Sequence, residues 1–317
     1  MELYRAQTQK VYNDFFYNNE PIVLDELPTV SVVRWDVDPD TGEKVEDVLS
    51  AGPVQFVDEE DGMYAFVIAD TELLIDEEIR VTWTYEVDNN DVSITQGYDV
   101  ITPYVNMAEA YKRLGFGKNA GEENYVPFDE MKHAESFARY MIEVYTGQKF
   151  GKYYKTVEAI GQNSDVLYVD DRVLYLDQMY VNNELVIDDD EDLNTFGYNV
   201  KISDTNFALK VNSNDDIAEG AKLDLVYEKH RAFMDGNAYK ITGYFGYDVV
   251  PPKIQYAAIM LMKDYFGKDN IWRARYVKNV SFGDTDMEFS SLAFRGTGNF
   301  FVDKLLSEYR TPNLAVI

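Results

Sequence analysis

The first hundred residues alternate between apolar and polar positions. Between residues 79 and 87, Ile79, Val81 and Trp83 share one face of a predicted strand, and the intervening polar residues lie on the other. The same period recurs over residues 30–37, 54–57, 64–68 and 98–102, with turn residues between the runs. Several short strands without helices between them favour an immunoglobulin-like β-sandwich over residues 22–106, although the cysteine pair of true immunoglobulin domains is missing.

The hydrophobic period changes to that of a helix beyond residue 106. A short helix is predicted over 107–114, and glycines follow it, so we interpret 107–127 as a linker. The next predicted helix covers 128–145 and stops at Gly147. Its expected buried face consists of Ala134, Phe137, Ala138, Met141, Ile142 and Tyr145. Glu143 falls outside that face and is expected to tolerate substitution.

Two further helices are predicted in the second half of the chain. A run rich in Tyr and Gly over 239–247 leads to Pro251 and Pro252, and proline is well placed at the start of a helix. This helix buries Ile254, Ala257, Ala258, Leu261, Met262 and Tyr265 in our interpretation. The last helix, 299–309, places Val302, Leu305, Leu306 and Tyr309 on one stripe.

These patterns predict an α+β protein. An N-terminal all-β immunoglobulin-like sandwich is followed by a domain over 128–310, in which three helices accompany an inserted β region over 155–248. Residues 1–21 are aromatic-rich and form either an arm that packs on a neighbour or the first strand of the sandwich. Residues 311–317 form an apolar tail that Pro312 keeps out of the preceding helix.

Charge narrows the range of partners. The chain of 317 residues carries 57 acidic and 29 basic residues, a formal net charge of −28, which argues against a surface that binds nucleic acid or anionic lipid. There is no cysteine, so disulfide and thiolate chemistry are excluded. No apolar run approaches the roughly 18 residues of a membrane span, and the N-terminus lacks the layout of a signal peptide, so we expect a soluble protein.

No motif in the chain indicates an enzyme. Asp36, Asp38 and Asp40 resemble the start of a calcium loop, but Thr41 and Asp47 stand where glycine and glutamate are required, and a hairpin turn over 39–42 explains the same residues. The two histidines, His133 and His230, lack the neighbours of a general base. We therefore expect no catalytic residue, metal or cofactor. A hydrolase with paired carboxylates stays as an alternative, since the many acidic residues permit such a pair without selecting one.

Three segments carry a family resemblance. They are Met141–Phe150 at the end of the first long helix, the Tyr-Gly strand that enters Pro251 and Pro252, and Leu305–Arg310 at the end of the last helix. In order and spacing, they resemble the head–tail connector (adaptor) proteins of tailed bacteriophages. The resemblance covers residues 128–317. The chain departs from the pattern through its larger β insertion, its long segment over 267–298 and its added N-terminal domain.

The resemblance implies a structural virion protein without enzymatic activity. Such proteins form a ring, twelvefold in the family, at the virion neck beneath the portal, and they assemble in the cytoplasm of the bacterial host. The implied partners are other copies, the portal protein and a tail-side connector or tail terminator protein. Double-stranded DNA passes through the channel without specific binding, and no membrane is involved. Another phage collar or tail ring protein and an immunoglobulin-like adhesin are the alternatives.

The resemblance also implies where the portal is bound. The family's C-terminal tail docks on the portal. The matching positions here are Tyr309, Arg310, Thr311, Pro312, Asn313, Leu314, Ala315, Val316 and Ile317.

Overall fold

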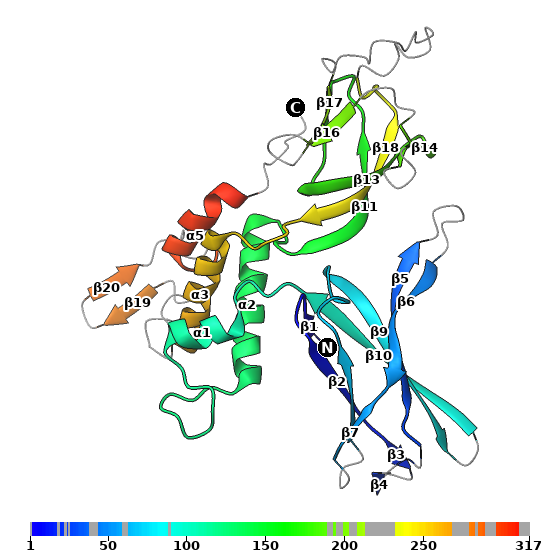
Figure 1. The fold of residues 1–317 in the computed structure, drawn as a ribbon. Coiled ribbons are helices and arrows are strands. Elements are labelled where there is room, and N and C mark those ends of the chain that lie inside the picture. Colours follow the sequence, from blue (N-terminus) through cyan, green and yellow to red (C-terminus); the bar gives the residue numbers. More distant parts are fainter. Residues whose placement is uncertain are drawn as a thin grey trace. The chain divides into compact units, whose positions relative to one another are not determined.

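The chain has mixed α+β structure, mostly sheet with four described helices (Figure 1). The computed structural model describes residues 2–17, 20–21, 24, 26–37, 44–58, 63–87, 90–188, 193–194, 199–202, 208–212, 232–267, 279–282, 285–288 and 296–310. Two compact units are present. Unit 1 comprises Met1–Thr102 with Lys152–Tyr154, and unit 2 comprises Pro103–Gly151 with Lys155–Ile317.

Unit 1 is built from strands. They are β1 (Glu2–Tyr4), β2 (Gln9–Asp14), β3 (Phe16–Tyr17), β4 (Glu20–Pro21), β5 (Thr29–Val37), β6 (Lys44–Pro53), β7 (Gln55–Asp58), β8 (Met63–Ile68), β9 (Glu77–Val87) and β10 (Asn90–Ile101). One sheet has the order β1-β10-β9-β5-β6, a second has the order β2-β8-β7, and β3 pairs with β4. The long β9–β10 pair is antiparallel, whereas β1 runs parallel to β10.

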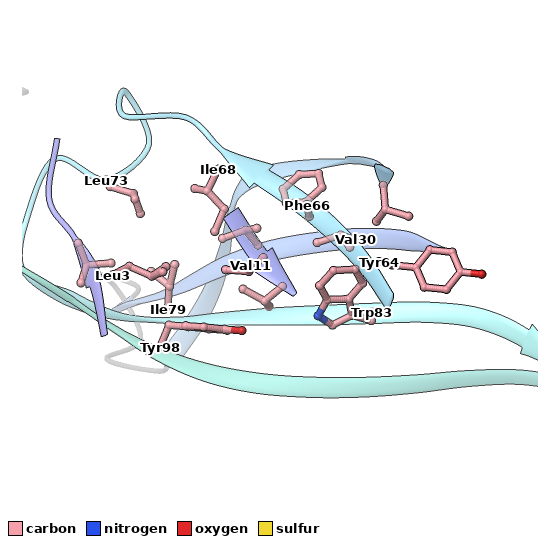
Figure 2. Packing of buried hydrophobic residues seen from close by; sticks show 14 of the residues in the cluster. Leu3, Val11, Val30, Tyr64, Phe66, Ile68, Leu73, Ile79, Trp83 and Tyr98 are labelled. Atoms are coloured by element: carbon pink, nitrogen blue, oxygen red, sulfur yellow. The ribbon is translucent and has the colours of Figure 1, made fainter. Parts of the chain in front are cut away.

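A single apolar cluster holds the two larger sheets of unit 1 together. Figure 2 shows side chains from both sheets meeting in it, with Trp83 from β9 near Tyr64 from β8. Ile79, Val81 and Trp83 are completely buried, which confirms the alternation predicted for this strand. Each large apolar side chain buried in this way contributes roughly 1.5–3 kcal/mol.

The N-terminal segment belongs to the sheets of unit 1. Strand β1 pairs with β10, and β2 pairs with β8 along its whole length. Leu3, Val11 and Phe15 are buried in the shared cluster. The sequence allowed this segment to be either an arm or the first strand of the sandwich. Residues 2–15 contribute strands to the sheets of unit 1, in agreement with the second interpretation.

The helices of unit 2 are α1 (Met107–Leu114), α2 (Phe128–Thr146), α3 (Pro252–Phe266) and α5 (Phe300–Leu306), the last followed by the 3-10 turn η3 (Ser307–Tyr309). The predicted helices are confirmed within a few residues at their ends. Helix α2 ends at Gly147, whose φ of 71° lies in the left-handed region that favours glycine. The side chain of Asn299 caps α5 by accepting hydrogen bonds from the backbone N–H groups of Phe301 and Val302.

The buried face of α2 differs from the predicted one. Ala134, Ala138 and Ile142 are completely buried as expected, but Phe137, Met141 and Tyr145 are only half-buried. Met131 and Glu135 are fully buried instead. The Glu135 carboxylate accepts a hydrogen bond of 2.7 Å from the backbone N–H of Tyr104 and lies 3.5 Å from Arg139 Nε, which offsets the cost of burying its charge.

The β region of unit 2 forms two sheets and a hairpin. The larger sheet has the order β11 (Lys152–Ile160), β18 (Ala238–Gly246), β13 (Val173–Val181), β14 (Glu184–Asp188) and β15 (Leu193–Asn194). The smaller has the order β12 (Val166–Tyr168), β17 (Ala208–Asn212) and β16 (Asn199–Ile202), while β19 (Asn279–Phe282) pairs with β20 (Thr285–Glu288). Gly243 in β18 is required by close packing, because a Cβ there would lie 2.2 Å from the backbone oxygen of Tyr175.

Candidate partner-docking site

The three segments that carry the family resemblance meet at one place in unit 2. Gln148, just beyond α2, donates a hydrogen bond of 2.5 Å from Nε2 to the backbone oxygen of Tyr309, at the end of η3. The hydroxyl of Tyr247, just beyond β18, donates to Oε1 of the same glutamine at 3.3 Å. One amide side chain therefore connects the ends of α2, β18 and η3.

An aromatic cluster surrounds this amide. Phe150 is completely buried at its centre. Its ring stacks on Tyr247 with centroids 5.0 Å apart and meets Tyr104 and Tyr309 edge-on at 5.7 and 5.6 Å. Such pairs add about 0.5–1.5 kcal/mol each beyond the area they bury. We call Tyr104, Gln148, Phe150, Tyr247 and Tyr309 the aromatic hub.

The hydroxyl of Tyr104 has a partner on each side. It donates to Oε1 of Glu143 at 2.7 Å and accepts from the backbone N–H of Phe150 at 3.0 Å. Burial, followed by the negative charge of Glu143 and the hydrogen bond to it, raises the pKa of Tyr104 well above its usual range. Glu143 is therefore not a freely exposed position: it is half-buried, and we expect removal of its carboxylate to be destabilising because it would leave a buried hydroxyl without its acceptor.

The end of the last helix is fixed against α2 and α3. The hydroxyl of Tyr145 donates to the backbone oxygen of Asp303 at 3.1 Å, and the guanidinium of Arg310 lies 5.4 Å from the centre of the Tyr145 ring. Lys253 at the start of α3 pairs with Glu308 at 2.5 Å, and this hydrogen bond raises the pKa of Lys253. Contacts with both α2 and α3 thus fix the position of the chain at residue 310, where the C-terminal tail begins.

The structure places part of the predicted docking set. Tyr309 belongs to the aromatic hub, and the guanidinium of Arg310 lies over the ring of Tyr145. Thr311, Pro312, Asn313, Leu314, Ala315, Val316 and Ile317 lie outside the described residues.

Sequence reasoning missed three residues that organise this site. Tyr104 and Arg172 are far from the motifs in the chain, and Arg172 lies 4.3 Å from the centre of the Tyr247 ring while donating to the backbone oxygen of Gly246 at 2.9 Å. Gln148 lay inside the quoted Met141–Phe150 motif. Its position directly after the glycine that ends α2 was the only signal available in the sequence.

The described residues offer little that points to catalysis. They contain no group of three or more His, Asp or Glu side chains that could hold a metal ion. His133 is exposed on α2, whereas His230, Asp38 and Asp40 lie outside the described part of the chain. Among the helices that the structure describes, none is long and apolar enough to cross a bilayer.

Comparison with known proteins gives a weak structural neighbour from a phage. No family model and no curated protein matches the chain. A solved structure, the N-terminal domain of phage TP901-1 ORF48, is similar over 31% of this chain and 81% of its own, with 17% identity and a TM-score of 0.20. The neighbour is a phage protein domain, and a likeness at this TM-score does not determine a fold or role for the chain.

Proposed function

We propose that the chain is a structural subunit of a tailed-phage virion. It forms a ring, twelvefold in related connectors, that joins the portal to the tail and surrounds the DNA channel. The observation that carries the proposal is the aromatic hub. The three segments that resemble the connector family are far apart in the chain, and Gln148 and Phe150 bring them into contact.

The hub gives the C-terminal tail a defined starting point. Tyr309 and Arg310 are held against α2, so the seven residues that follow begin at a fixed position on the subunit. Leu314, Val316 and Ile317 are apolar with high β-propensity, which suits them to add a strand to a partner or fill its groove. We assign residues 309–317 as the portal-docking segment.

The remaining features fit a conduit for DNA. A head-to-tail contact between identical subunits closes into a ring when its rotation permits. An acidic wall offers a sliding duplex no contacts that release counterions, so the duplex passes without being held. We assign unit 1 as an immunoglobulin-like domain added to the connector.

Deletion of Thr311–Ile317 tests the docking role. We expect the melting temperature of the purified subunit to change little, because the contacts of Tyr309 and Arg310 remain. In a phage that carries the truncated gene, we expect full heads without tails in electron micrographs. Full-length particles should show this chain as a twelvefold ring beneath the portal.

A matched control keeps the length of the tail and changes only its apolar character. Substituting Leu314, Val316 and Ile317 together with serine should reproduce the loss of tails, whereas Asn313→Ser should not. A truncated chain that melts far lower would show that the tail packs on its own subunit. Truncated particles that still carry tails would remove the docking role.

A further inference from the structure

On two helices of unit 2, α2 and α5, large apolar side chains that neighbour each other are exposed to solvent. On α2, Tyr140 and Val144 are 63% and 64% exposed, and on α5, Phe300 and Phe301 are 77% and 69% exposed. Single exposed apolar residues are normal on a protein surface. Here they occur as neighbouring pairs, one turn apart on α2 and adjacent on α5, so each pair forms a small apolar patch.

Each pair faces away from the core of its own helix. At 100° per residue, Tyr140 and Val144 lie opposite the buried Ala138 and Ile142, and Phe300 and Phe301 lie about 100–160° around the helix from the buried Val302 and Leu306. Helix α3 packs against both α2 and α5, and it lies between them in Figure 1. Helices α2 and α5 also meet directly, through the hydrogen bond from Tyr145 to Asp303, but the α2 patch (Tyr140, Val144) and the α5 patch (Phe300, Phe301) consist of different side chains on different helices.

Charge indicates what covers these patches. Residues 1–102 contain 24 acidic and 5 basic residues, whereas the helical segments 103–151, 247–267 and 296–310 together contain 11 acidic and 10 basic residues. Two copies of a chain with net charge −28 repel each other over most of their surface. They can approach with the least electrostatic cost where the surface is neutral, and the apolar patches lie in that neutral part.

We propose that the α2 patch of one copy binds the α5 patch of the next copy. The contact is head-to-tail, since it joins two different surfaces, and repeated contacts of this kind generate a ring or a filament rather than a closed dimer. The inference rests on the proposed ring and names the surfaces that build it. Burial of the four apolar side chains drives association, and the balanced charges around them avoid repulsion.

Two double variants test the contact in the full chain. The α2 variant carries Tyr140→Ser and Val144→Ser, and the α5 variant carries Phe300→Ser and Phe301→Ser. A control variant carries Ile160→Ser and Tyr168→Ser, two exposed apolar residues on β11 and β12. Sedimentation velocity measures association, and circular dichroism melting checks that each variant is folded.

We expect the wild type and the control to associate equally and each double variant to associate at least tenfold more weakly. When the α2 and α5 variants are mixed, each still has the patch that the other lacks, so heterodimers form and growth stops there. Heterodimers in the mixture distinguish a head-to-tail contact from a symmetric one. In a symmetric contact, one of the two variants would dimerise alone.

Other outcomes overturn the inference in recognisable ways. If both double variants associate like the wild type, the patches are not the interface, although the proposed ring stands. If they associate normally but no longer bind portal rings, the patches bind the portal instead. If the wild type does not associate at high protein and salt concentration, and forms no ring when portal rings are added, both this inference and the proposed function are wrong.

Discussion

Tyr104 connects three parts of unit 2 through one hydroxyl group. It lies just before α1, yet its partners are Glu143 near the end of α2 and the backbone of Phe150. Its ring also forms one wall of the aromatic hub. A side chain with this many buried contacts stabilises the unit mainly because its removal leaves other buried groups unsatisfied.

Replacing Tyr104 with phenylalanine keeps the ring and removes the hydroxyl. The Glu143 carboxylate then loses its donor and the Phe150 N–H loses its acceptor, so we expect the free energy of unfolding to fall by about 1–3 kcal/mol. Urea unfolding followed by tyrosine fluorescence or circular dichroism measures the change. Tyr168→Phe serves as the control, since Tyr168 is exposed on β12. Equal stability of the Tyr104→Phe protein would contradict the assigned hydrogen bonds.

The raised pKa of Tyr104 predicts how stability depends on alkaline pH. Above roughly pH 10, the unfolded chain releases the tyrosine proton while the folded chain still holds it. The unfolded state then binds fewer protons, so the free energy of unfolding falls as pH rises toward the folded pKa. Below pH 10 this contribution is fully present. Melting temperatures between pH 8 and 11 should decline less steeply for Tyr104→Phe than for the wild type, and parallel curves would contradict the assignment.

At the scale of elements, the sequence predicted where the helices lie and most of the buried face of α3, but it predicted only part of the buried face of α2. Period, proline and glycine placed α2, α3 and α5, because those signals are local. The buried Glu135 could not be foreseen, since its burial depends on the Tyr104 N–H, which is 31 residues away. The aromatic hub was equally hidden, because contacts such as that of Gln148 with Tyr309 follow from how three elements pack.

Helix α3 gives the cleanest test of a buried helical face. Leu261 is 2% exposed, so Leu261→Asp places an unpaired charge in the core and should cost about 3 kcal/mol or more. That is a large part of a typical stability of about 5–15 kcal/mol. Tyr256→Asp is the control on the same helix, at a position that is 51% exposed. Met141→Asp should cost less than Leu261→Asp, because Met141 is only half-buried.

Thermal and urea unfolding of the three proteins measures these differences. The expected order of stability is Tyr256→Asp, then Met141→Asp, then Leu261→Asp. A folded Leu261→Asp protein with unchanged stability would show that this face of α3 does not form the core.

At the scale of the whole molecule, charge is distributed unevenly along the chain. Unit 1 carries most of the excess of acidic residues, and the helical segments are close to neutral. The sequence showed the total charge, but which residues are helical and exposed had to come from the structure. The neutral helical surface, where we propose that copies meet, becomes visible only when the sequence and the structure are combined.

Raising the salt concentration should therefore strengthen the association between copies. We also expect no binding to duplex DNA, so salt should have no effect on it. The Debye length falls from about 30 Å at 0.01 M to about 10 Å at 0.1 M ionic strength, which screens the repulsion between acidic subunits. We expect sedimentation velocity to show stronger self-association at 0.3 M than at 0.02 M sodium chloride. Gel-shift assays with a duplex should show no binding at either concentration. Duplex binding that weakens with salt would contradict the acidic-conduit interpretation.

The parallel pairing of β1 with β10 also governs how unit 1 responds to force. Glu2 lies opposite Asp99 and Tyr4 opposite Ile101, so the first strand of the unit and its last strand run side by side in the same direction. A load that pulls residue 2 away from residue 102 acts along these strands. Their hydrogen bonds are then sheared together rather than opened one at a time, which makes the pair a mechanical clamp between the two ends of the unit.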